Sequence, residues 1–410
     1  MGSSLGSLVC VAVAAVFGDA PLQSPQSRAE ALEAARAARA AALVPYAPTT
    51  PEAILFAIED RYLFERMLNA PRGLFARLGG LPTGSGLAGG PAGRYSTHTV
   101  SATITSAASL QRAWEIAAAL EFPTLADDHV FIALHGRKRE LPLEDFSGLG
   151  PDAEDSDRTS YRYRDLLVDV TAGVSPIDSL TVAGSFGRLQ PAVGPRGGPA
   201  GGRAGVPSIE TRFDDDSAPG LDQQPAFDRF GLAVRVDATD ESLGSRTGSR
   251  LDVAWRRYVD RDLDTYSFDH WILDGRQYVP ILTGARTLAV RARFEHLAPA
   301  AGATVPFYLR PTLGGPDSIR GLRSYRFRDR TLALLQAEYR WPVNAFLGGV
   351  FFYDAGTVAD GPSRLTLRSF THDFGLGLRM GFLSQSFLRA EVAFGGTDGT
   401  ALVLRFGDVF

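Results

Sequence analysis

The sequence predicts an all-β protein, namely a transmembrane antiparallel β-barrel of about sixteen strands with a short helical segment before it. Two observations lead to this fold class. From about residue 71 onward, apolar residues alternate with polar or small ones, which is the two-residue period of a strand. The alternating runs reach about ten residues, the length that a tilted strand needs to cross a bilayer, whereas strands of soluble sheets usually have about five or six. The connections between the runs also sort by length.

Composition limits the alternatives. The chain of 410 residues is 45% hydrophobic and 21% charged, with a formal net charge of −4. It lacks the basic patch interleaved with aromatic residues that nucleic-acid binding needs, so we expect no nucleic-acid partner. No internal stretch reaches the ~18 apolar residues of a membrane helix. A membrane-spanning form of this chain would therefore be a barrel, whose strands have average hydropathy.

The N-terminal part predicts two segments before the barrel. Residues 1–20 contain an apolar stretch with the only cysteine, Cys10, and end on Ala20 in a small-x-small pattern typical of a secretory signal peptide. Residues 21–70 predict a helical periplasmic segment, because an apolar pattern of helical period covers residues 51–69. We expect a tether or a plug at the barrel mouth; an interfacial or partner-binding helix is the alternative.

The barrel is predicted over residues 71–410. In residues 373–382, apolar side chains occupy the even positions and polar or small ones the odd positions. Counting strands back from the C-terminus sorts the connections onto two sides. The short ones are 174–176, 241–248, 279–283, 341–343 and 383–385, and the long ones are 141–159, 191–225 and 299–327. Short periplasmic turns and long outer loops are typical of an outer-membrane barrel.

The C-terminal strand alternates in the same way and ends on Phe410. A strand that ends the chain on an aromatic residue suits a barrel whose first and last strands pair, because such pairing leaves no free edge. Asp408 interrupts its apolar face. We therefore expect the end of this strand to lie at the level of the lipid headgroups.

A motif spans the end of the last long connection. Residues 314–330 read Gly-Gly-Pro-Asp-Ser-Ile-Arg-Gly-Leu-Arg-Ser-Tyr-Arg-Phe-Arg-Asp-Arg. Residues 337–342 read Ala-Glu-Tyr-Arg-Trp-Pro, and residues 351–356 read Phe-Phe-Tyr-Asp-Ala-Gly. Together with the terminal phenylalanine, these segments resemble the outer-membrane assembly-factor superfamily, in particular the bacterial surface antigen family of BamA/TamA-like barrels.

The resemblance implies particular roles for five residues. A long outer loop would carry Arg320, Gly321 and Leu322 back into the lumen, and Leu322 stands where the family usually has phenylalanine or tyrosine. The family's C-terminal assembly signal would correspond to Phe406 and Phe410.

The same residues make physical sense without the family. Glu338 and Asp354 each lie on the face opposite their aromatic neighbours, so both carboxylates are predicted to point into the lumen from neighbouring strands. The guanidinium of Arg320 would there find two acceptors, a geometry that arginine serves better than lysine. We expect Gly321 to permit a tight turn at the loop tip and Gly356 to leave room for close passage of backbone. The alternative is scattered lumen charges solvated by channel water.

Chemistry of other kinds has weak support. His135 faces the predicted lumen, but no Gly-x-Ser-x-Gly or His-Glu-x-x-His motif accompanies it. The acidic segments 152–157 and 214–216 could hold divalent cations, yet their spacing is not that of an EF-hand and a solvated loop is favoured. The glycine-rich segment 194–202 opens no helix and predicts a flexible loop. We therefore expect no enzyme, catalytic residue, metal or cofactor.

The resemblance implies a bacterial outer-membrane protein that assists the insertion or translocation of proteins. The family's assembly factors carry periplasmic chaperone-like modules before the barrel, whereas only residues 21–70 stand there in this sequence. A passive pore or a structural surface antigen without assembly activity is the alternative. The implied partners are outer-membrane lipid and lipopolysaccharide, the barrel assembly machinery for its own insertion, and client outer-membrane proteins.

Overall fold

A computed structural model describes most of the predicted barrel. It covers residues 72–79, 81–82, 84–126, 129–197, 205–240, 245–282, 286–344, 347–382 and 385–406. The predicted signal peptide (1–20) and helical segment (21–70), together with Asp408 and Phe410, lie outside the described residues.

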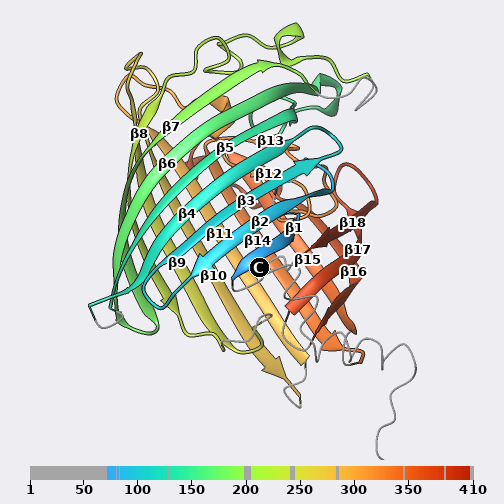
Figure 1. The fold of residues 1–410 in the computed structure, drawn as a ribbon. Coiled ribbons are helices and arrows are strands. Elements are labelled where there is room, and N and C mark those ends of the chain that lie inside the picture. Colours follow the sequence, from blue (N-terminus) through green and yellow to red (C-terminus); the bar gives the residue numbers. More distant parts are fainter. Residues whose placement is uncertain are drawn as a thin grey trace, which may run out of the picture. The chain divides into compact units, whose positions relative to one another are not determined.

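One antiparallel sheet of sixteen strands, paired in sequence order, forms the barrel wall (Figure 1). The strands are β1 (Gly73–Leu78), β2 (Ala88–Ser96), β3 (Ser101–Ser109), β4 (Trp114–Leu125), β5 (Val130–Phe146), β6 (Thr159–Ile177), β7 (Leu180–Pro195), β8 (Phe227–Asp237), β9 (Gly248–Asp260), β10 (Phe268–Ile281), β11 (Arg286–Pro299), β14 (Thr331–Pro342), β15 (Leu347–Ala359), β16 (Thr371–Phe382), β17 (Gln385–Gly395) and β18 (Ala401–Phe406). The predicted all-β barrel of about sixteen strands is confirmed.

Shorter elements lie in the connections. A second sheet consists of β12 (Thr312–Leu313) and β13 (Phe327–Arg328), between β11 and β14. The 3₁₀ turns are η1 (Asp155–Asp157), η2 (Ile209–Thr211), η3 (Phe307–Leu309), η4 (Pro362–Arg364) and η5 (Leu367–Ser369). Among the described residues, no helix has the length and apolar character to cross a membrane.

The polarity of the wall is the inverse of that of a soluble barrel. On β16, Phe374, Leu376 and Leu378 point outward and are about half exposed. The alternate position Asp373 and the inward Glu391 of β17 are fully buried. An apolar outer band around a polar interior is the pattern of a transmembrane barrel.

Three strands run further than the sequence indicated. β5, β6 and β7 have 17, 19 and 16 residues, so the predicted long connections 141–159 and 191–225 are in part strand. The additional strand residues include aromatic side chains that are buried at the end of the barrel with the long loops. The rings of Phe146 and Tyr161 lie 4.9 and 5.0 Å from that of Phe307. Burial of these rings favours continued strand where the pattern predicted loop.

The first and last strands are the two edges of the sheet. Each has six residues, and no ladder joins β1 to β18 over the described part of the chain. The edges nevertheless approach at one point, because a Cβ built on Gly79 would lie 3.9 Å from the Cβ of Phe406. The predicted pairing of first and last strands is therefore absent as a ladder within the described residues. We call this junction the seam.

Candidate functional site in the barrel lumen

The connection between β11 and β14, residues 300–330, contains the predicted motif, and we call it the lumen loop. Its hairpin of β12 and β13 supports a tip in which the N–H of Gly315 donates to the carbonyls of Ile319 and Leu322, at 3.1 and 3.0 Å. Gly314 and Gly315 have φ of +115° and +98°, a region that favours glycine. Gly314 and Gly315 therefore allow the backbone to turn at the tip of the loop.

Arg320 of this tip is held by carboxylates from the barrel wall. Its Nε and Nη2 donate to the two oxygens of Asp354 at 2.7 and 2.8 Å, and its Nη1 donates to Glu338 at 2.8 Å. The carboxylates come from the neighbouring strands β15 and β14. All three side chains are completely buried. A bidentate arginine–carboxylate pair fixes both distance and orientation.

A third carboxylate completes the site. Glu391 of β17 lies 3.3 Å from Nη1 of Arg320 and is fully buried. Glu338 also accepts from Arg379 and Arg340, each at 2.7 Å. Buried charges are costly to desolvate unless they are paired, and here each carboxylate faces at least one guanidinium. The network connects the loop to β14, β15, β16 and β17.

An aromatic ring supports the same guanidinium from β15. The Cζ atom of Arg320 lies 3.5 Å from the centre of the Phe352 ring, a cation–π contact. The ring in turn lies against Gly375 of β16, where a Cβ would be 2.3 Å from the Phe352 Cζ. Glycine at this inward position is thus required for the ring to lie flat beneath Arg320.

Comparison with known proteins identifies the family. A model of the Omp85 superfamily domain matches residues 152–406, more than half of the chain. The chain belongs to the Omp85 superfamily. No curated protein sequence matches it. The predicted resemblance to this lineage of barrels is therefore confirmed.

Solved structures with the same fold include two Omp85-like barrels. BamA from Haemophilus ducreyi lacking POTRA domains 1-3 is 12% identical, with a TM-score of 0.56, over 82% of this chain and 68% of that chain. CdiB from Escherichia coli is 11% identical, with a TM-score of 0.51, over 82% of this chain and 61% of that chain. This chain therefore spans less than two thirds of the CdiB chain. The likeness concerns the fold.

The two glycines predicted for this site, Gly321 and Gly356, both lie in close contact with neighbouring groups. Gly321 has no left-handed φ. Its N–H donates to the carboxylate of Asp373, and a Cβ would lie 2.9 Å from Asp373 Oδ2. Close approach to β16, and not a tight turn, is what excludes a side chain there. A Cβ at Gly356 would lie 2.9 Å from the Ala333 carbonyl oxygen and 3.0 Å from Leu313. Gly356 thus makes room for a side chain of the loop as well as for backbone.

The remaining predicted residues lie in two places. Leu322 is 2% exposed and packs in a buried cluster with Leu313, Ile319 and Phe327. Leu322 therefore packs in an apolar cluster, whereas Arg320 lies in the charged network. Phe406 lies far from this cluster in sequence, at the seam beside Gly79.

Sequence reasoning missed the ion pairs and hydrogen bond that connect the lumen loop to the last two strands. Asp317 lies 2.7 Å from Arg405 of β18 and 3.3 Å from Arg389 of β17. Arg389 also donates to the Pro316 carbonyl at 3.1 Å. Inward parity could have drawn attention to the two arginines, because both stand on the polar face of an alternating strand. No local signal identified their acceptor in the loop.

The opposite side of the loop is fixed to the long-loop end of β5 and β6. Arg328 donates to the Tyr161 hydroxyl at 2.7 Å, and its carbonyl accepts from the N–H of Gly150 at 2.9 Å. Arg323 donates to Ser147 at 2.9 Å and Arg326 to the Ala153 carbonyl at 2.7 Å. The lumen loop is thus held from both sides of the barrel.

The weaker candidates for chemistry stand apart from this site. His135 lies 3.8 Å from Asp169 on the inner wall. Asp214 is bonded within its own loop by Ser217, whose hydroxyl and N–H lower the pKa of that carboxyl. Within the described residues, no three His, Cys, Asp or Glu side chains are grouped as metal ligands.

Proposed function

We propose that this Omp85 barrel lies in a bacterial outer membrane and assists the insertion or translocation of other proteins, without a catalytic step. The observation that carries the proposal is the seam, where two edge strands of six residues meet with no ladder over the described residues. A sheet edge is a template for an added strand. A client strand would pair there, next to the bilayer.

The lumen loop would control this edge. Asp317 connects the loop to β17 and β18, while the Arg320 network fixes the loop to β14 and β15. The last strands would therefore be held in place from inside the barrel while the seam opens. Client outer-membrane proteins, outer-membrane lipid and lipopolysaccharide are the proposed partners, and barrel assembly machinery would insert this chain itself.

A disulfide across the seam tests the proposal. The Cβ separation of 3.9 Å between positions 79 and 406 is within the range for a disulfide, and the chain's only cysteine is Cys10. In cells that depend on the Gly79→Cys, Phe406→Cys variant, we expect oxidation to reduce the amounts of client proteins in the outer membrane. Reduction of the same protein should restore them, which controls for the loss of Phe406.

A second cross-link provides the matched control. Ala102 and Leu120 are opposite each other on β3 and β4, which are already paired. A disulfide there should leave client amounts unchanged. If the oxidised seam variant remains active, the seam does not open for clients. If depletion of the protein leaves the outer-membrane proteome unchanged and alters only permeability, the passive-pore alternative replaces the proposed function.

A further inference from the structure

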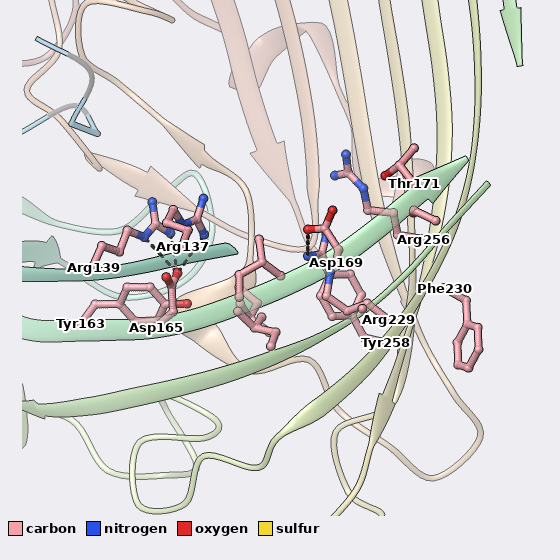
Figure 2. A pocket seen from close by; sticks show the side chains of 15 residues that line it. Arg137, Arg139, Tyr163, Asp165, Asp169, Thr171, Arg229, Phe230, Arg256 and Tyr258 are labelled. Atoms are coloured by element: carbon pink, nitrogen blue, oxygen red, sulfur yellow. Dashed lines mark hydrogen bonds and ion pairs between the residues drawn. The ribbon is translucent and has the colours of Figure 1, made fainter. Parts of the chain in front are cut away.

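A polar cavity lies in the inner wall, formed by β5 to β9 (Figure 2). Its volume is about 430 Å³, within the range of small-molecule sites. Leu309 of the lumen loop borders it, but its lining includes none of Arg320, Glu338, Asp354 and Glu391. The cavity is therefore separate from the site that holds the loop tip.

One glycine lines the cavity, and a second lies between two of its lining residues. Gly187 of β7 stands between Asp169 and Arg229 in the strand register, and Gly231 of β8 stands between Ser185 and Arg256. A Cβ at Gly187 would lie 2.5 Å from the Asp169 Cβ. A Cβ at Gly231 would lie 2.4 Å from the Ser185 hydroxyl oxygen. Because both positions are glycine, the side chains of Asp169, Ser185 and Arg256 have room to extend over the neighbouring strand.

The cavity has an excess of positive charge. Its lining contains four arginines and two aspartates, which are Arg137, Arg139, Arg229, Arg256, Asp165 and Asp169. Asp165 is shared by two of the arginines, 3.1 Å from Arg137 and 2.8 Å from Arg139. Four positive and two negative groups leave a net charge of about +2 when each is ionised.

Arg229 and Arg256 have N–H donors that are not used in hydrogen bonds within the described structure. Arg229 lies 3.9 Å from Asp169, longer than a hydrogen bond, and its buried Nε has no hydrogen-bond partner in the described structure. Tyr258 holds it in place, with the ring centre 5.2 Å from the guanidinium carbon. The side chain of Arg256 has no ion pair or hydrogen bond to any described residue, and its Cγ would lie 3.7 Å from a Cβ at Gly231. Figure 2 shows Arg256 and Thr171 among the side chains that line the cavity.

We propose that this cavity binds a small phosphate-bearing molecule through Arg229 and Arg256, with the hydroxyls of Thr171 and Ser185 as further donors. A phosphate monoester carries a charge of about −1.5 to −2 at pH 7 and would neutralise the excess, whereas a single carboxylate would leave about half of it. Guanidinium groups match phosphate oxygens with two parallel hydrogen bonds. The inner wall faces away from the bilayer, so the ligand is a dissolved molecule rather than a lipid headgroup. The proposal does not depend on the assembly function.

Titration of the purified full-length barrel in detergent tests this site, with inorganic phosphate and glycerol 3-phosphate as probes and acetate as the carboxylate comparison. We expect saturable phosphate binding and at least about tenfold weaker binding in Arg256→Gln and in Arg229→Gln. Arg256→Gln breaks no ion pair of the described residues, so it should fold even if Arg229→Gln does not. Retention of folded-barrel mobility on unheated gels identifies the variants that are folded.

Arg250→Gln is the matched control. Arg250 lies on the same inner face of β9, is paired with Asp252 at 2.8 Å, and does not line the cavity. Its replacement should leave phosphate affinity within about twofold of the unmodified protein. The proposal is overturned if the unmodified protein shows no saturable phosphate binding, or if Arg256→Gln binds as well as the unmodified protein. It is equally overturned if acetate binds as tightly as phosphate, or if Arg250→Gln weakens binding as much as Arg256→Gln.

Discussion

The carboxylate of Asp317 lies 2.7 Å from the guanidinium of Arg405, which joins the tip of the lumen loop to the last strand of the barrel. The two side chains are 46% and 25% exposed, so water screens the pair in part. The partner strand of β18 across the seam contributes no ladder in the described residues. The lumen loop therefore contacts β18, which is an edge strand of the sheet.

Neutralising this carboxylate should loosen the edge without unfolding the barrel. The partly exposed pair with Arg405 contributes about 0–1 kcal/mol, and the amide oxygen of asparagine can still accept from the buried Arg389, so Asp317→Asn is expected to lower the urea midpoint only slightly. Hydrogen–deuterium exchange should become faster in β18, because the strand loses the ion pair between Arg405 and the lumen loop. Asp360→Asn is the control, since Asp360 is 52% exposed and pairs with Arg330 at the same distance of 2.7 Å. Exchange in β18 that is equally fast in both variants would contradict the coupling.

Removing the central guanidinium should have a much larger effect. Arg320→Ala leaves Glu338, Asp354 and Glu391 buried together with less compensating charge, a change that costs about 3–5 kcal/mol. We expect lower barrel assembly and a lower temperature of unfolding, measured by heat-dependent gel mobility. Arg320→Lys should recover part of the loss, because lysine restores the charge without the bidentate geometry.

An exposed arginine serves as the control for that series. Arg368 lies in the exposed turn η5 and its replacement by alanine should change neither assembly nor heat stability. If Arg320→Ala behaves like Arg368→Ala, the buried network does not stabilise the barrel.

Glycine at the base of the site should be intolerant of one methyl group. In Gly375→Ala the new Cβ would lie 2.1 Å from the Val392 carbonyl oxygen and 2.3 Å from the Phe352 ring. Overpacking of this kind costs about 1–3 kcal/mol, so the urea midpoint should fall. Gly361→Ala, where no atom lies within 4 Å of the built Cβ, should leave the midpoint unchanged. Equal midpoints in the two variants would show that both the Phe352 ring and the Val392 backbone move aside freely.

The sequence predicted what depends on local pattern. Alternation along a strand decides which face each residue occupies, so the barrel and the inward positions of Glu338 and Asp354 follow from parity. Glu391 escaped notice because its partner Arg320 is 71 residues away, and beside Arg389 it resembles an ordinary lumen charge. The constraint on Gly321 is likewise tertiary, since it comes from Asp373 on another strand. Contacts of this kind leave no periodic trace in the sequence.

The carboxylates of the site should differ in importance in a predictable order. Glu338 receives three guanidiniums at 2.7 to 2.8 Å, from Arg320, Arg340 and Arg379, whereas the pairs of Glu391 with Arg320 and Arg389 are longer, at 3.3 and 3.6 Å. Glu338→Gln should therefore lower the urea midpoint more than Glu391→Gln, because it leaves more buried positive charge without an acceptor. Combining each change with Arg320→Ala measures the coupling: the loss should be strongly non-additive for Glu338 and closer to additive for Glu391. The reverse order, or additivity in both cycles, would mean that Arg320 is held chiefly by Asp354 and the Phe352 ring.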